Sequence, residues 1–129
     1  MQHEARRPLV LVIEDDRDSR RLYAEELQRA GYSVSEAHNG LQAAEKAAEL
    51  EPDVIVTDLG LPGIDGYELC RRLHRDERLG RIPIVAITGR YFSEADIARA
   101  HREGCKAVLI KPIVGDELVA EIRKVLNQK

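Results

Sequence analysis

The chain lacks most of the residues that mark redox, zinc-binding and secreted proteins. Its 129 residues include no tryptophan, one phenylalanine and only two cysteines, Cys70 and Cys105, which form no CxxC or CxxxC motif. Closely spaced cysteine pairs carry much of the known redox and structural zinc chemistry, so neither is expected here. The simplest interpretation is two reduced thiols, each buried or half-buried, because cysteine behaves largely as a small hydrophobic residue.

A basic surplus and a long apolar segment are also missing. The formal net charge is -3, with 33% charged and 43% hydrophobic residues, which is typical of a soluble globular protein without a general attraction to nucleic acid or anionic membranes. The apolar runs are far shorter than the ~20 residues of a membrane-spanning helix, and no signal-peptide core follows residues 1–7. We therefore expect a cytoplasmic protein that binds neither nucleic acid nor membrane directly.

What the chain does contain is a regular alternation of β-like and helix-like segments. Strand patterns cover residues 9–13, 33–37, 54–57, 84–87 and 107–110, and helix patterns cover residues 17–30, 40–50, 65–75, 94–102 and 116–127. The first, third and fourth strand patterns are continuously apolar, as in parallel strands covered on both faces, whereas residues 33–37 alternate like an edge strand. We expect one α/β domain, residues 8–127, forming a doubly wound (βα)5 three-layer sandwich between flexible termini, residues 1–7 and 128–129.

Polar residues end or follow four of these strand patterns. They are Glu14 and Asp15 after the first, Asp58 after the third, Thr88 after the fourth and Lys111 after the fifth. The carboxyl ends of parallel strands lie at one edge of a sheet, where open α/β folds bind their ligands, so we expect these side chains to converge. The next residue, Asp16, is instead expected to cap the first helix.

The converging carboxylates predict a bound cation. Two like charges about 4 Å apart repel by roughly 4 kcal/mol at an effective dielectric constant of 20. Carboxylate oxygens with room for water suit Mg²⁺, and no histidine or cysteine lies near them in sequence to favour Zn²⁺. Asp15 and Asp58 are the expected ligands, and the backbone carbonyl of Gly60 could supply another oxygen.

These residue types together permit the reversible phosphorylation of Asp58. Its carboxylate can act as the nucleophile, Lys111 supplies a fixed positive charge, and the Thr88 hydroxyl can donate a hydrogen bond to a phosphoryl oxygen. Phosphoryl transfer needs mainly positioning and charge stabilisation, which these groups provide. The sequence therefore predicts a Mg²⁺-assisted signalling switch that assists its own phosphorylation, and not an enzyme acting on a separate substrate.

Four segments resemble the receiver domains of bacterial two-component response regulators, of the chemotaxis-regulator type, and the resemblance extends over residues 8–127. They are VIEDD at 12–16, TDLGLPGIDG at 57–66, PIVAITG at 83–89 and LIKP at 109–112. The resemblance implies a flavodoxin-like sheet with strand order 2-1-3-4-5 and, in many such domains, a cis Lys111–Pro112 bond.

The resemblance also implies a role for each site residue. Asp58 would be the phosphoacceptor, and Asp15 would be a metal ligand, with Glu14 as its acidic neighbour that acts directly or through water. Thr88 would be the switch hydroxyl, and Lys111 would contact the phosphoryl group. A sensor histidine kinase or histidine phosphotransfer protein would donate the phosphoryl group, and a downstream protein would bind the product.

One departure from this family pattern keeps alternatives open. Val108 stands where most receivers have the aromatic half of the switch, and Tyr91 and Phe92 are candidates to replace it. The alternatives are a degenerate receiver that serves as a phosphate-independent binding scaffold, and a Mg²⁺-dependent phosphatase with Asp58 as nucleophile. The phosphatase is disfavoured because Gly60 occupies the place of the second acid that would protonate the leaving group. The chain is either a single-domain regulator or the receiver of a larger protein such as a hybrid kinase.

Overall fold

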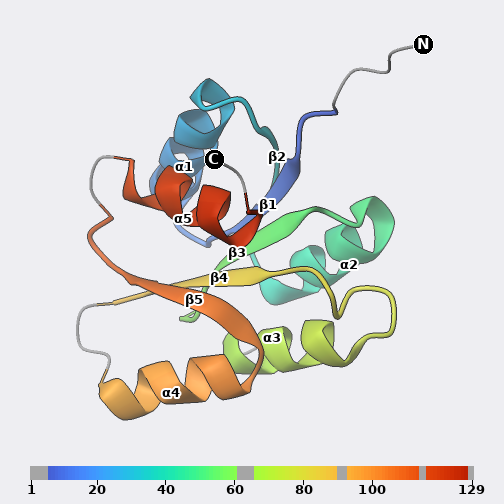
Figure 1. The fold of residues 1–129 in the computed structure, drawn as a ribbon, viewed down its shortest axis with the longest axis vertical. Helices are drawn as coiled ribbons and strands as arrows, with labels where there is room; N and C mark the ends of the chain where they lie inside the picture. Colours follow the sequence, from blue (N-terminus) through green and yellow to red (C-terminus); the bar gives the residue numbers. More distant parts are fainter. Residues whose placement is uncertain (1–5, 61–65, 90–92, 114–115, 128–129) are drawn as a thin grey trace.

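The alternating pattern forms a five-stranded parallel sheet between two layers of helices (Figure 1). The computed structural model describes residues 6–60, 66–89, 93–113 and 116–127. Its elements are β1 (Leu9–Ile13), α1 (Arg17–Arg29), β2 (Ser33–Ala37), α2 (Gly40–Leu50), β3 (Val54–Asp58), α3 (Gly66–Arg75), β4 (Ile84–Thr88), α4 (Glu94–Arg102), β5 (Cys105–Ile110) and α5 (Glu117–Val125). The strand order is β2-β1-β3-β4-β5, which confirms the predicted flavodoxin-like fold and the edge position of residues 33–37. Within the described residues, no helix is both long and apolar enough to cross a membrane.

Each central strand contributes side chains to two separate cores, which explains its continuous apolar sequence. In β1, Val10 and Val12 pack with α1 and α5, whereas Leu11 and Ile13 pack with α2, α3 and α4 on the other face. Figure 1 shows α1 and α5 together on one side of the sheet and the other three helices on the opposite side. Burial of apolar surface is the main driving force for folding. A shift of one residue in the register would move side chains out of their core, so packing on both faces keeps the strands in register.

The register aligns the carboxyl ends of the strands. Ile13 pairs with Thr57, Asp58 with Ile87, and Thr88 with Ile110. Asp58 and Thr88 are therefore the last residues of their strands, while Glu14 and Lys111 are the first residues beyond β1 and β5. These four of the predicted site residues therefore lie at one edge of the sheet.

Element boundaries differ slightly from the sequence prediction, most clearly in β5. That strand begins at Cys105, two residues before the predicted start at 107, and its register with β4 shifts between Ile84 and Val85. Lys106 is the extra residue at the shift, since Cys105 pairs with Ile84 and Ala107 with Val85. An exposed lysine inside the strand interrupts the apolar pattern, so the sequence alone indicates a shorter strand.

Side-chain caps define the starts of α1, α2 and α4, and Asn39 is the cap of α2. Asp16 is the N-cap of α1 and accepts a hydrogen bond from the Ser19 amide over 2.9 Å, as predicted. Ser93 and Asp96 form a reciprocal capping box at the start of α4. Such caps satisfy backbone amides that lack partners within the helix. Asp16 therefore has a structural role at the start of α1 and leaves the neighbouring acids to form the candidate site.

Candidate functional site

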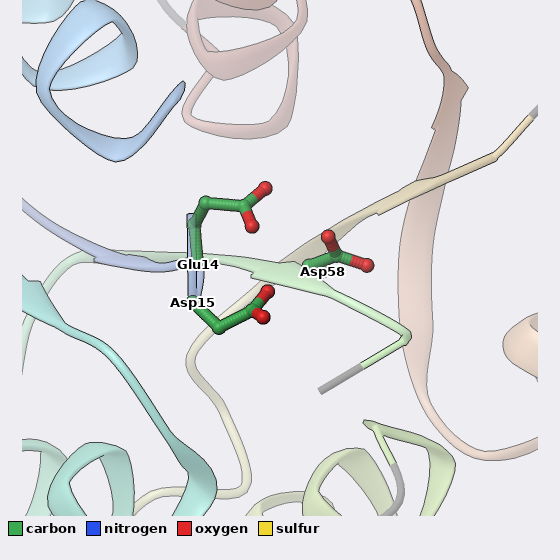
Figure 2. A group of neighbouring side chains, drawn as sticks. All are labelled: Glu14, Asp15 and Asp58. Atoms are coloured by element: carbon green, nitrogen blue, oxygen red, sulfur yellow. The ribbon is translucent and has the colours of Figure 1, made fainter. Parts of the chain in front are cut away.

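Three carboxylates gather where β1 and β3 end. Oxygen atoms of Glu14, Asp15 and Asp58 all lie within 4.8 Å of one another, and Figure 2 shows the side chains of Glu14 and Asp15 extending toward Asp58. Glu14 is only 2% exposed and Asp58 only 9%, whereas Asp15 is exposed to solvent. The site is thus a partly buried acidic cluster in which Asp15 is the exposed member.

Lys111 crosses this pocket from the end of β5. Its Nζ donates to Asp58 Oδ2 over 2.8 Å and to Glu14 Oε1 over 3.1 Å. Its backbone amide donates to the Thr88 carbonyl over 2.7 Å, which ties the end of β5 to the end of β4. The Lys111–Pro112 peptide bond is cis. Lys111 therefore links the end of β5 to the ends of β1 and β3 through its ammonium group and to the end of β4 through its backbone amide.

The electrostatics of the pocket favour proton or cation uptake. Burial, reinforced by the nearby Asp58 charge, raises the pKa of Glu14 to about 7, although hydrogen bonds from the Asp16 amide and Lys111 oppose the shift. Burial disfavours the Lys111 ammonium, but its hydrogen bonds with Asp58 and Glu14 outweigh that cost and raise the pKa of Lys111. Among the described residues, three acidic groups thus face one ammonium group, so this part of the site carries more negative than positive charge.

Backbone amides fix the orientation of the two buried carboxylates. The Gly60 amide donates to Asp58 Oδ1 over 2.7 Å, and the Asp16 amide donates to Glu14 Oε2 over 3.0 Å. Gly66, the first residue of α3, lies directly against the backbone of Leu59, where an added Cβ would approach to 2.5 Å. The close approach holds the segment after Asp58 against α3, and only glycine fits there.

The donor set fits the magnesium ion expected from the sequence. Carboxylate oxygens are the ligands Mg²⁺ prefers, and among the described residues no histidine or cysteine joins the acidic cluster. Asp15 and Asp58 would hold the ion, with Glu14 beside them. Gly60 lies next to Asp58, but a ligand role for its carbonyl stays a prediction.

Comparison with known proteins agrees with this geometry. The family model for the response regulator receiver domain matches residues 10–123. The chain belongs to the response regulator receiver domain family. Among curated relatives, the DNA-binding dual master transcriptional regulator RpaA of Synechocystis sp. is 36% identical over 94% of this chain, and the polar-differentiation response regulator DivK of Brucella anthropi is 32% identical over 92%. The chain spans 50% of the length of RpaA and 95% of that of DivK.

Solved structures show the same fold. The chemotaxis response regulator CheY4 of Vibrio cholerae has a TM-score of 0.87 and 26% identity, covering 93% of this chain and 99% of its own. The receiver domain of a signal transduction histidine kinase from Syntrophus aciditrophicus has a TM-score of 0.85 and 27% identity, covering 93% of this chain and 90% of its own. The predicted family and fold are both confirmed, and the chain is a signalling domain of the two-component type.

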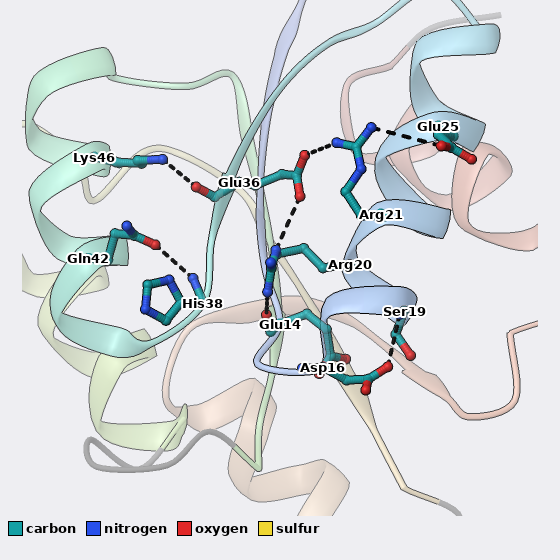
Figure 3. A network of polar contacts seen from close by, with 10 residues as sticks. All are labelled: Glu14, Asp16, Ser19, Arg20, Arg21, Glu25, Glu36, His38, Gln42 and Lys46. Atoms are coloured by element: carbon teal, nitrogen blue, oxygen red, sulfur yellow. Dashed lines mark hydrogen bonds and ion pairs between the residues drawn. The ribbon is translucent and has the colours of Figure 1, made fainter.

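A second polar network, which the sequence did not predict, supports the receiver pocket from the side of β2 (Figure 3). Arg20 of α1 donates from Nη1 to the Glu14 carbonyl over 2.9 Å and from Nε to Glu36 Oε1 over 3.1 Å. Glu36 also pairs with Arg21, and its carbonyl accepts a hydrogen bond from Lys46 of α2. Arg20 therefore positions the backbone at Glu14, and no local sequence pattern marks it for that role.

Of the residues that concern the missing aromatic half of the switch, only Val108 lies in the described part of the chain. Val108 is half-buried in β5 and packs against the core formed with α2, α3 and α4. Tyr91 and Phe92, the predicted substitutes for the missing aromatic residue, lie outside the described residues. The roles of Asp58, Asp15, Glu14, Thr88 and Lys111 stay predictions, because the structure establishes their positions and not their chemistry.

Proposed function

We propose that this receiver domain, residues 8–127, is a phosphoacceptor switch. Asp58 takes a phosphoryl group from a phosphohistidine on a sensor histidine kinase or a histidine phosphotransfer protein, and the modified domain changes its contacts with a downstream protein. The observation that carries the proposal is the bridge from Lys111 Nζ to both Asp58 Oδ2 and Glu14 Oε1 beside the exposed Asp15. Because both partner classes act on cytoplasmic substrates, the proposal includes a cytoplasmic location.

The proposed reaction uses the Asp58 carboxylate as a nucleophile. One of its oxygens forms a bond to phosphorus while the phosphorus–nitrogen bond of the phosphohistidine breaks, and the imidazole nitrogen leaves with the bonding electrons. The Gly60 amide and Lys111 hold the two oxygens of Asp58 in place, so little reorientation precedes attack. The product is an aspartyl phosphate at the end of β3.

Charge stabilisation would come from both sides of Asp58. Lys111 places its ammonium 2.8 Å from Asp58 Oδ2, close enough to contact the incoming phosphoryl group. Mg²⁺ held by Asp15 and Asp58 would neutralise the remaining phosphoryl charge. Without that ion, the acidic pocket would repel a phosphoryl donor.

Thr88 is proposed to convert the chemical change into a structural one. Thr88 is the last residue of β4 and is 1% exposed, and its backbone carbonyl accepts a hydrogen bond from the Lys111 amide. A hydrogen bond from its hydroxyl to the phosphoryl group would draw the segment between β4 and α4 toward Asp58.

A phosphate-independent scaffold is the second candidate, and Val108 favours it. A half-buried valine packed in the core offers no aromatic side chain that could move between buried and exposed positions. In that case the α4–β5 surface would bind its partner equally well before and after phosphorylation.

Intact mass spectrometry tests the proposal. The protein is incubated with Mg²⁺ and acetyl phosphate, and we expect a single adduct of about 80 Da. The adduct should be absent in Asp58→Asn and in samples without divalent cations. A matched control is Asp53→Asn. Asp53 directly precedes β3, at the end opposite Asp58, and its carboxylate accepts a hydrogen bond from the Leu9 amide over 2.7 Å.

The controls separate the two candidates. Asp53→Asn should be phosphorylated like the wild type, since an asparagine oxygen can still accept the Leu9 amide. An adduct that survives Asp58→Asn would contradict the proposed acceptor. No adduct, in a reaction that labels another receiver domain treated in parallel, would instead favour the scaffold.

A further inference from the structure

The two cysteines, distant in sequence, meet inside the protein. Cys70 of α3 and Cys105 at the start of β5 are 35 residues apart, and their Sγ atoms lie 3.4 Å from each other. Both are buried in the core beneath α2, α3 and α4, with exposures of 0% and 4%. The sequence predicted buried thiols but gave no sign that they touch, because their contact depends on how α3 packs against the sheet.

We propose that Cys70 and Cys105 form a reversible intramolecular disulfide, making them a redox modification site of this domain. A disulfide requires the sulfur atoms at about 2.05 Å, so the two Sγ atoms need to approach by only about 1.4 Å. The thiols already share an S–H···S contact.

A cavity beside Cys105 gives small oxidants a route to the pair. Cys105 lines a cavity of about 480 Å³ at the amino end of β4 and β5, together with His74, Arg81, Arg102 and Lys106. Cys70 is fully buried behind it and does not line this cavity. Cys105 is therefore the sulfur that an oxidant meets first, and Cys70 is the one that completes the bond.

The reaction balances with hydrogen peroxide as the oxidant. The Cys105 sulfur attacks one peroxide oxygen, the oxygen–oxygen bond breaks, and water leaves to give a sulfenic acid. The Cys70 sulfur then attacks the Cys105 sulfur, the sulfur–oxygen bond breaks, and the hydroxyl leaves as water with the Cys70 proton. Overall, two thiols and one peroxide give one disulfide and two waters, and a dithiol reductant reverses the change.

The crosslink would join α3 to the junction between α4 and β5. α4 ends at Arg102, so Cys105 follows it by three residues. The disulfide would restrain that junction, whereas Lys111, at the other end of β5, would keep its contacts with Asp58 and Glu14. The redox site is therefore independent of the proposed phosphorylation, and each can be tested without the other. Disulfides in reducing compartments are typically transient and regulatory, which suits a site of this kind.

Thiol counting on the folded wild-type protein tests this proposal. The protein is treated with hydrogen peroxide under native conditions, quenched with catalase, denatured and alkylated with N-ethylmaleimide. We expect the monomer to lose about 2 Da, as two thiol hydrogens are removed, and to take up no maleimide. Dithiothreitol before alkylation should restore two maleimide adducts. Non-reducing peptide mapping should identify a Cys70–Cys105 linkage.

Thermal unfolding gives a second measurement on the same sample. Closing a loop between residues that are 35 positions apart should raise Tm by about 10–15 °C relative to the reduced protein. Cys70→Ser should lose both the mass change and the Tm shift under oxidation and should instead add oxygen at Cys105. If oxidised wild type keeps two alkylatable thiols, gains only oxygen, or forms a disulfide-linked dimer, the proposal is wrong. None of these outcomes depends on whether Asp58 is phosphorylated.

Discussion

The carboxyl and amino ends of the same sheet carry opposite charges. Acidic Glu14, Asp15 and Asp58 cluster at the carboxyl end, whereas Arg81, Arg102 and Lys106 surround the cavity at the amino end. Each helix leaves the carboxyl end with its N-terminus and reaches the other end with its C-terminus. Acids accordingly occupy the first turns of α1, α3, α4 and α5, and bases occupy their last turns.

This difference indicates why the two ends suit different chemistry. Backbone amides at the carboxyl end donate to carboxylates, as the Gly60 and Asp16 amides do, and amides in such positions are suited to the phosphoryl group of the proposed reaction. The amino end offers carbonyls and packed side chains, and there the reactive groups are the buried thiols. Substitutions matched between the two ends can measure how completely the functions are separated.

The largest expected effect is the loss of the Lys111 ammonium. Lys111→Met should slow phosphorylation by acetyl phosphate about 10²- to 10³-fold, because one preorganised positive group no longer stabilises the transferred phosphoryl group. The rate of adduct formation, followed by intact mass at fixed Mg²⁺, checks this. Circular dichroism confirms that the variant remains folded.

The matched control lies on the same strand at the other end. Lys106→Met removes an exposed lysine beside Cys105 and should leave the phosphorylation rate within about twofold of wild type, since surface substitutions away from special features have small effects. A comparable slowing in both variants would show that overall charge, and not the position of Lys111, controls the reaction.

The next effect concerns pH and the buried carboxyl of Glu14. Its pKa is about 7 in the folded protein against 4.5 for the ordinary group, so the folded state keeps a proton that the unfolded state has lost. The protonated Glu14 carboxyl therefore contributes to the free energy of unfolding fully below pH 4.5, and this contribution is lost as the pH rises through 7. A shift of this size corresponds to about 3 kcal/mol.

Urea unfolding at pH 5 and pH 8, without divalent cations, measures this contribution. The free energy of unfolding of the wild type should fall by up to about 3 kcal/mol relative to that of Glu14→Gln across this range. Glu49→Gln, which removes an exposed acid from α2, should retain the wild-type dependence. Parallel curves for wild type and Glu14→Gln would contradict a raised pKa. At pH 8, adding Mg²⁺ should stabilise the wild type more than the glutamine variant.

The sequence predicted the fold and the composition of the acidic pocket because both depend on local patterns. Continuous apolar runs identified strands covered on two faces, and the polar residues directly after Ile13 and Ile110 located the edge of the sheet where the acidic cluster lies. Once strands are parallel, their carboxyl ends must lie together, so convergence of Glu14, Asp58 and Lys111 follows from topology.

Features that depend on packing between distant elements were not predicted. The hydrogen bonds of Arg20 with Glu36 and the Glu14 carbonyl depend on the angle of α1 against β2, which periodicity does not encode. The Cys70–Cys105 contact likewise depends on the placement of α3. The first two residues of β5 were also not predicted, because the exposed Lys106 interrupts the apolar pattern of the strand.

The smallest expected effects come from glycines at the two ends. An alanine at Gly66 would meet the Leu59 backbone at 2.5 Å, and one at Gly104, where φ is +107°, would meet the His74 ring at 2.6 Å. Each substitution should lower the free energy of unfolding by about 2 kcal/mol. At Gly66 the cause is overpacking against backbone, and at Gly104 it is backbone strain together with overpacking that movement of the exposed His74 side chain partly relieves. Gly31→Ala has a similar φ of +103° with no atom within 4 Å and should cost only about 1 kcal/mol.

Phosphorylation distinguishes the two ends even though the stability losses are alike. Gly66→Ala pushes on Leu59, the residue after Asp58, so it should slow adduct formation about tenfold by misplacing the carboxylate. Gly104→Ala disturbs only the junction between α4 and β5 and should leave the rate unchanged, while altering the contact between Cys70 and Cys105. Equal slowing in both variants would mean that the ends are mechanically coupled through β4 and β5, and that the charge separation between them does not isolate their chemistry.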